Sequence, residues 1–412
     1  MLVGEIIKYY RQRAGLTQEE LGRGICSVTH VSKIESGKTP FSAEIIHLFS
    51  ERLHIDIEKE VNRLENLGDQ LHLMHKLIIL QRMKEVEEIK RELDTMPIIM
   101  SSQYAALYLL LLARYYMLTS DYEKAKMILL QVQRDYPELD PYEKNMLRHV
   151  KGISYMIDYR KANIGSYQAA IQLLKKINRE EYGNLEYYYH LAAAYQWVNS
   201  PVMSYSYAEK ALRYFKEIDH FIGAILAESV MLIATSSDNE QDFNEVEATY
   251  KRLIYNSEML NTPDKKTLLL NNLGYQYFMR KDYVPAKNAF QEALSLVPKP
   301  SPLYLQRWHN YLKCCFEGKL MRKTELLKKA REGLRMARGL DNSIYKIVFK
   351  LLVYKIEEND EKYYLFLEEV AIPYFVSSNS DTTKKRYGKE LYEYYVKNEQ
   401  FEKAVKIADI LL

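Results

Sequence analysis

The sequence predicts an all-α protein in which a small helical domain is followed by a long array of helical hairpins. Three observations support this fold class. Only 15 Gly and 11 Pro interrupt 412 residues, as expected for helices joined by short turns. Apolar side chains recur at helical spacing through most of the chain. After residue 66, amphipathic helices of about 12 to 17 residues alternate with short breaks, which indicates a repeat.

The composition excludes several protein classes. Hydrophobic residues make up 47% and charged residues 27%, the balance of a folded rather than a disordered chain. Cys26, Cys314 and Cys315 form neither a disulfide framework nor a zinc-binding spacing, so we expect a reducing cytoplasm, no metal and no cofactor. The N-terminus begins with an amphipathic helix rather than the apolar core of a signal sequence, and the longest apolar run, Ala105–Leu112, is too short to cross a membrane, so we expect neither export nor membrane insertion.

Residues 1–58 carry the pattern of a domain built from short helices. Apolar side chains at helical spacing predict a first helix over residues 3–13. Thr17 and Glu20 then form a capping box, in which each residue can accept a hydrogen bond from the backbone of the other. We expect this second helix to end near residue 24. After a tight turn, Ser27 caps a third helix.

Two short helices joined by a tight turn form the unit that lays its second helix in the DNA major groove. The pattern is carried by the runs Gly15-Leu-Thr-Gln-Glu-Glu-Leu21 and Ile25-Cys-Ser-Val-Thr-His-Val-Ser-Lys-Ile-Glu-Ser-Gly37. These runs closely resemble the Cro/repressor helix-turn-helix family. They depart from the family pattern by a shorter turn and by Gly22, where Ala is usual.

The resemblance implies DNA-contacting roles for side chains of the second and third helices. Base edges would be contacted by Val28, Thr29 and Lys33, with His30 nearby, and phosphates by Gln18, Ser27, Ser32 and Lys38. Lys can donate to guanine, Thr can meet thymine, and a helix N-terminus favours phosphate. We expect Thr17 and Glu20 to act as caps, Cys26 as a turn residue, and Arg11 with Glu35 as an internal ion pair.

The rest of the chain contains a helical repeat. The spacing of the tetratricopeptide signature, about 34 residues long, is matched by Leu273, Gly274, Tyr277, Ala286, Phe290, Ala293 and Pro298. Further matches cover residues 112–137 and 391–411, with a weaker one at 191–211. Small residues at such positions let paired helices approach closely. We therefore expect a right-handed tetratricopeptide superhelix over residues 71–412, joined to the N-terminal domain by a linker helix at 59–70.

Stacked hairpins line an inner wall with their first helices, a surface suited to an extended peptide. The polar and aromatic side chains expected on this wall are Arg114, Tyr189, His190, Gln196, Asn271, Asn272, Tyr275, His309, Asn310 and Lys313. Asn can pair with the backbone of any peptide, and Arg can bind a carboxylate through two hydrogen bonds. Packing roles are the alternative, because Asn272 can bond to a neighbouring helix and the tyrosines of 187–189 can fill a hairpin core.

A Cro-type domain followed by a tetratricopeptide body resembles the RRNPP family of peptide-pheromone receptors of Gram-positive bacteria. The resemblance implies a cytoplasmic quorum-sensing transcription regulator. Such a regulator would be a homodimer or higher oligomer that binds an inverted-repeat operator in double-stranded DNA. A short signalling peptide would change the superhelix, and residues 59–70 would transmit the change to the DNA-binding domains.

The sequence leaves one alternative function open and argues against another. A Rap-like protein would use the repeat domain to bind a phosphorelay response regulator under peptide control, with DNA binding secondary. An enzyme is not expected, because the sequence has no Walker A loop and no GxSxG, HExxH or paired-carboxylate motif.

Overall fold

The computed structural model describes residues 2–157, 164–235, 242–377 and 381–411. Every regular element in these ranges is a helix, so the predicted all-α class is confirmed. The described chain divides into two compact units, Met1–Val150 and Lys151–Leu412, with the boundary inside one helix. Among the described helices, none has both the length and the apolar character that crossing a membrane requires.

The first unit begins with a small head of short helices. These are α1 (Leu2–Arg13), α2 (Gln18–Gly22), α3 (Val28–Glu35), α4 (Ala43–Leu53) and α5 (Ile57–Glu65). They enclose a core in which Ile6, Ile7, Leu21, Val31, Ile34 and Phe49 are fully buried. Both predicted caps are present, because Thr17 and Glu20 form the capping box and the Ser27 hydroxyl accepts from the His30 N–H.

The close approach of α2 and α3 explains the unusual Gly22. A Cβ atom on this residue would lie 2.9 Å from Val31 Cγ2, so alanine would push α3 away. The helix also ends at Gly22, two residues earlier than expected. Its terminal carbonyls are bound by Arg52 of α4, which donates to the oxygens of Leu21 at 2.8 Å and Arg23 at 2.6 Å.

The segment 59–70, expected as one linker helix, is shared between two helices. α5 ends at Glu65, and α6 (Leu67–Ile79) begins directly after Asn66. At this junction the Asn66 side chain donates to the Asn62 carbonyl at 2.8 Å, so a side chain competes with the helix backbone. α5 packs on α1 of the head, whereas α6 packs on helices of the first repeat.

The remainder of the first unit consists of helical hairpins. Its elements are α7 (Met83–Leu93), the 3-10 helix η1 (Pro97–Ser101), α8 (Ala105–Leu118), α9 (Tyr122–Asp135) and the first part of α10 (Pro141–Ile157). α8 and α9 form the hairpin predicted from the signature at 112–137, with Ala113 and Ala125 buried between them.

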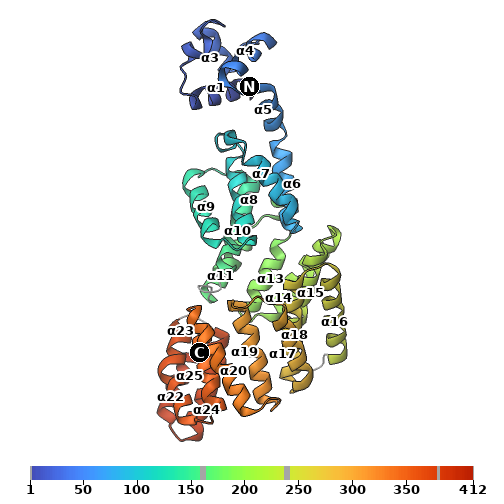
Figure 1. Ribbon diagram of the computed structural model, residues 1–412, viewed down its shortest axis with the longest axis vertical. Helices are drawn as coiled ribbons and strands as arrows, with labels where there is room; N and C mark the ends of the chain where they lie inside the picture. The colour runs from blue at the N-terminus through green and yellow to red at the C-terminus, as the bar shows by residue number, and fades with distance from the viewer. Residues whose placement is uncertain (1, 158–163, 236–241, 378–380, 412) are drawn as a thin grey trace. The chain divides into compact units, whose positions relative to one another are not determined.

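The second unit continues the repeat as pairs of consecutive helices, for example α17 with α18 and α24 with α25 (Figure 1). Its elements are α11 (Ile164–Leu174), α12 (Arg179–Tyr182), α13 (Tyr187–Trp197), α14 (Pro201–Glu217), α15 (Phe221–Ala234), α16 (Phe243–Met259), α17 (Pro263–Met279), α18 (Tyr283–Ser295), α19 (Pro302–Glu317), α20 (Lys323–Gly339), α21 (Ser343–Ile356), α22 (Asp360–Phe366), the π-helix η2 (Leu367–Ala371), α23 (Ile372–Ser377), α24 (Asp381–Lys397) and α25 (Phe401–Leu411).

The signature residues pack as the repeat requires. Leu273, Gly274 and Tyr277 of α17 are buried, and so are Ala286, Phe290 and Ala293 of α18. A Cβ atom on Gly274 would come within 2.8 Å of the Phe290 ring, so only glycine lets these two helices approach this closely.

One turn geometry joins many of the paired helices. A residue in the left-handed region lies two positions after the last residue of the first helix, and the next residue is the N-cap of the second helix. This pattern occurs at Ser120-Asp121, Lys281-Asp282, Asp341-Asn342 and Glu358-Asn359. In the second of these turns, the Asp282 N–H donates to the Tyr277 carbonyl at 2.9 Å, which satisfies an oxygen at the helix end. Three-residue turns of this kind keep the connections short without Gly or Pro.

Candidate functional site

The third helix of the head, α3, presents one polar exposed face. Ser27, Val28, Thr29, Ser32 and Lys33 are exposed, whereas Val31, Ile34 and Glu35 are buried. At about 3.6 residues per turn, positions 28, 29, 32 and 33 lie on the same side of the helix. His30 is half-buried, and Lys38 is exposed just beyond the helix end. The structure thus gathers most of the predicted DNA contacts on one surface.

Gln18, predicted to contact phosphate, is engaged inside the head. Its Nε2 donates to Glu35 Oε2 at 2.8 Å. Glu35 also accepts two hydrogen bonds from Arg11, at 2.5 Å from Nε and 3.0 Å from Nη2, which confirms the predicted ion pair. One N–H of the Gln18 amide is therefore structural, and a phosphate contact through its second N–H stays a prediction.

The inner-wall asparagines of α17 and α19 include a bonded pair. Asn310 Nδ2 donates to Asn271 Oδ1 at 2.9 Å, and both residues are half-buried. Asn271 Nδ2 has no hydrogen-bond partner in the part of the chain that the structure describes. This pair therefore offers a fixed amide donor, the group that binds a peptide carbonyl.

Asn272 lies next to this pair but bonds elsewhere. Its Nδ2 donates to Ser229 Oγ of α15 at 3.3 Å, and Ser229 is buried. This is the contact with a neighbouring helix that the sequence left as the alternative for Asn272. The amide joins two hairpins, so its role in peptide binding stays a prediction with a competing structural role.

Three other predicted contacts divide between core and surface. Tyr189 of α13 packs on Phe215 with ring centroids 6.3 Å apart, and burial raises the pKa of its phenol to about 12. Gln196 accepts a hydrogen bond from Ser204 at 3.4 Å. Tyr275, by contrast, is 51% exposed and stacks on Phe278. Of these three, Tyr275 presents the largest free surface to a ligand.

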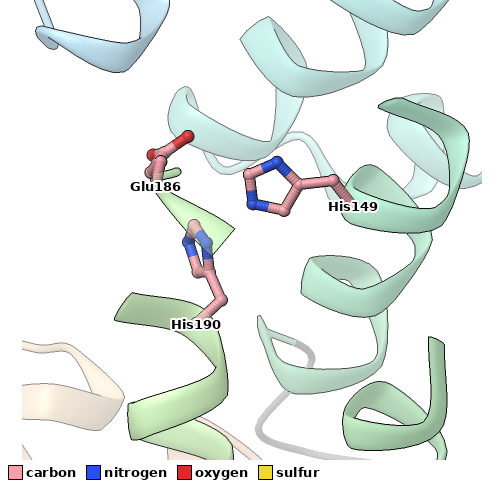
Figure 2. Close-up of side chains that lie close together, drawn as sticks. All are labelled: His149, Glu186 and His190. Carbon is pink, nitrogen blue, oxygen red and sulfur yellow. The ribbon is translucent and has the colours of Figure 1, made fainter. Parts of the chain in front are cut away.

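His190 lies beside an acidic side chain at the start of α13. A ring nitrogen of His190 and a carboxylate oxygen of Glu186 lie within 4.8 Å of each other (Figure 2). Both are residue types that can bind a metal ion. Figure 2 also labels His149, which belongs to the first unit. Arg114, another predicted contact, is buried in α8 of that first unit.

His309 and Lys313, two predicted contacts on α19, line one cavity of about 160 Å³ in the second unit. The other lining residues come from α19, α21, α22 and α24, and are Phe316, Glu317, Val348, Leu351, Leu352, Lys355, Tyr363, Arg386 and Tyr387. Burial and the nearby Arg386 lower the pKa of His309 to about 3 and that of Lys313 to about 8. Lys355 and Arg386 also line this cavity but were not among the contacts predicted from the sequence.

Comparison with known proteins agrees with this architecture. A helix-turn-helix family model matches residues 7–59. Over 398 residues, the chain is 23% identical to the transcriptional activator NprA of Geobacillus stearothermophilus, covering 93% of this chain and 96% of NprA.

Two solved structures share the fold. NprR in complex with its cognate peptide NprX has a TM-score of 0.68 at 19% identity, covering 84% of this chain and 98% of NprR. A Rap protein complexed with competence and sporulation factor has a TM-score of 0.70 at 14% identity, covering 84% of this chain and 97% of the Rap chain. The helix-turn-helix head, the similarity to NprA along almost the whole chain and the shared repeat fold together support the resemblance of this chain to RRNPP regulators with an N-terminal helix-turn-helix domain.

Proposed function

We propose that this chain regulates transcription by binding operator DNA through α3, under the control of a short peptide bound by its repeats. The observation that carries the proposal is the exposed face of α3, where Val28, Thr29, Ser32 and Lys33 lie together. That face belongs to a helix-turn-helix head on a chain similar throughout to a transcriptional activator. NprA is a transcriptional activator, and we assign no catalytic activity to this chain.

Peptide control is supported by the inner face of the second unit. NprR, which shares the fold, was solved with its cognate peptide. In this chain, the Asn271–Asn310 pair supplies amide groups and Tyr275 supplies an exposed aromatic face. Amide groups hold a peptide backbone whatever its sequence, and an aromatic ring adds apolar contact area.

We further propose that the DNA-bound form is a homodimer or a dimer of dimers. One helix-turn-helix domain buries too little surface for tight specific binding, and two-fold symmetry matches an inverted repeat.

The test combines operator selection with peptide addition. The purified full-length chain is incubated with fragmented genomic DNA, and the retained fragments are sequenced with and without synthetic peptides from small open reading frames beside its gene. Retained fragments should share an inverted repeat, and one peptide should change their recovery. Recovery of random fragments would overturn the DNA-binding role, whereas recovery that no peptide alters would overturn peptide control.

A second function is favoured by the fold shared with a Rap protein. The repeat domain would then bind a phosphorelay response regulator. Pull-down of purified response regulators with the full-length chain, with and without peptide, separates the two functions, because a transcription regulator of the proposed kind retains DNA but no response regulator.

A further inference from the structure

The cavity among α19, α21, α22 and α24 has the features of an anion-binding site. Three cationic side chains line it, Lys313 from α19, Lys355 from α21 and Arg386 from α24. Its apolar walls are the buried Val348, Leu351 and Leu352. Lys313 is half-buried beside these walls, where the local dielectric is lower than in water and an anion is bound more strongly. Arg386 is exposed to solvent.

The three cations differ in how they are neutralised. Lys313 lies 3.4 Å from Glu317, and Lys355 is paired with Glu390. Arg386 has no carboxylate partner among the residues that the structure describes, and its guanidinium lies 5.1 Å from the Tyr387 ring centroid. One positive charge at the cavity therefore lacks a counter-charge from the protein.

A hydrogen-bond donor accompanies this charge. Tyr363 lines the cavity and is 1% exposed, and its hydroxyl makes no hydrogen bond within the described part of the chain. Burial and the nearby Glu390 carboxylate raise the pKa of this phenol. A buried hydroxyl without a partner costs stability unless a bound group completes its hydrogen bond. The buried hydroxyl and the unpaired guanidinium together are the groups that a carboxylate takes as partners.

We propose that this cavity binds a carboxylate of the peptide ligand, either an Asp or Glu side chain or the free C-terminus, with Arg386 and Lys313 as its cationic partners. The inference rests on the proposed peptide control and adds the chemical class of the ligand. The cavity is continuous with the predicted contacts, because His309 lines it and the adjacent Asn310 is bonded to Asn271. The low pKa of His309 keeps this ring neutral, so the positive charge at the cavity comes from the lysines and Arg386.

The experiment uses the full-length chain and a random heptapeptide library, synthesised once with free C-termini and once amidated. Retained peptides are identified by mass spectrometry for the wild type, Arg386→Gln and Lys313→Gln. Lys389→Gln is the matched control, because Lys389 lies on the same helix as Arg386, is exposed and does not line the cavity.

The wild type and Lys389→Gln should enrich carboxylate-bearing peptides at least tenfold, whereas both cavity variants should retain peptides with little or none of this preference. Enrichment confined to the free-terminus library assigns the C-terminal carboxylate, and enrichment of Asp or Glu in the amidated library assigns a side chain. Peptides retained by the wild type equally from both libraries, without enrichment of Asp or Glu, would overturn the inference but leave peptide control intact. No retained peptide in any protein would overturn both.

Discussion

The phenol of Tyr10, in the first helix of the head, donates a 2.6 Å hydrogen bond to Glu60 Oε2 of α5. Glu60 is buried and also accepts from Arg63 at 2.9 Å. Arg63 in turn donates to the Thr95 hydroxyl at 2.6 Å, beyond the end of α7. A continuous polar chain thus runs from the DNA-binding head to the first repeat, all within the first unit.

We expect this polar chain to transmit the effect of a bound peptide to the head. Arg63→Ala should leave operator affinity without peptide nearly unchanged, because the contacts on α3 remain. The change in operator affinity on adding peptide should shrink at least threefold, since Arg63 joins α5 to the end of α7. Fluorescence anisotropy with labelled operator measures both quantities.

Arg82→Ala is the control for Arg63, because Arg82 forms a similar pair with Glu85, three residues away, on the surface. Equal peptide responses in the two variants would exclude a coupling role for the polar chain.

Lys33 on the exposed face of α3 and Lys38 just beyond the helix end should affect DNA binding differently when they are replaced. Lys33→Ala should weaken operator binding by about 1–3 kcal/mol and relax the preference for one base pair, because a groove contact is lost. Lys38→Ala should weaken binding to all sequences and reduce its salt dependence, as expected for a phosphate contact. Binding to a set of single-base operator variants at several salt concentrations tests both. Identical profiles for the two variants would show that the assigned register of α3 is wrong.

Features of the head that depend on neighbouring residues were predictable from the sequence. The capping box at Thr17 and the cap at Ser27 lie within one helical turn, so the residue types alone indicate them. The ion pair of Arg11 with Glu35 was predicted because the family resemblance supplied the distant partner.

Contacts between distant residues were not predictable without such help. Arg52 binds carbonyls at the end of α2 some 30 positions earlier, and nothing local to Arg52 indicates this. Arg386 joins the cavity of His309 because α24 packs onto the preceding helices, and the repeat signature marks hairpin packing rather than inner-face chemistry. The partner of Asn272, Ser229, lies in a degenerate repeat whose register the sequence left undefined.

Because several histidines are buried, we expect the folded chain to lose stability in mild acid. Burial lowers the pKa of His75 to about 3, of His220 to about 4 and of His309 to about 3. When the pKa of a histidine is lower in the folded chain than in the unfolded chain, the fold has its full stability above the unfolded pKa, about 6.5. Stability is then lost as the pH falls below that value, because the unfolded chain binds the proton more strongly. At pH 5 each such ring should cost roughly 2 kcal/mol relative to pH 7.

Melting temperatures at pH 7 and pH 5 test this effect. His75→Gln should show a smaller difference between the two pH values than the wild type. His47→Gln should match the wild type, because the His47 side chain is 73% exposed. A His75→Gln protein with the full wild-type pH dependence would mean that His75 already carries its charge in the fold.

The contact of Gly274 with Phe290 predicts a large effect of one methyl group. Gly274→Ala should destabilise the second unit by about 1–3 kcal/mol, because the added carbon overlaps a buried ring. Gly339→Ala is the matched control, since no atom lies within 4 Å of a Cβ atom at that position. Its alanine should be neutral or slightly stabilising, as helix propensity favours alanine over glycine. Urea unfolding of both proteins measures the difference, and equal midpoints would contradict the packing argument.

The two adjacent asparagines of α17 should have different roles, one in peptide affinity and the other in the stability of the fold. Asn271→Ala should weaken binding of the cognate peptide by about 1–3 kcal/mol with little change in melting, because its free amide donor serves a ligand. Asn272→Ala should lower the melting temperature, because Ser229 loses its partner between two hairpins.

Asn310→Ala should resemble Asn271→Ala in calorimetry, because removal of either side chain breaks the amide pair that fixes both groups. Each variant is compared with the wild type by helicity before binding is measured, so that a folding defect is recognised. If all three variants bound peptide with wild-type affinity, these amides would serve only to join hairpins, and the ligand would lie elsewhere on the repeats. A loss of affinity in Asn272→Ala alone would instead assign peptide contact to the residue whose amide is bonded to Ser229.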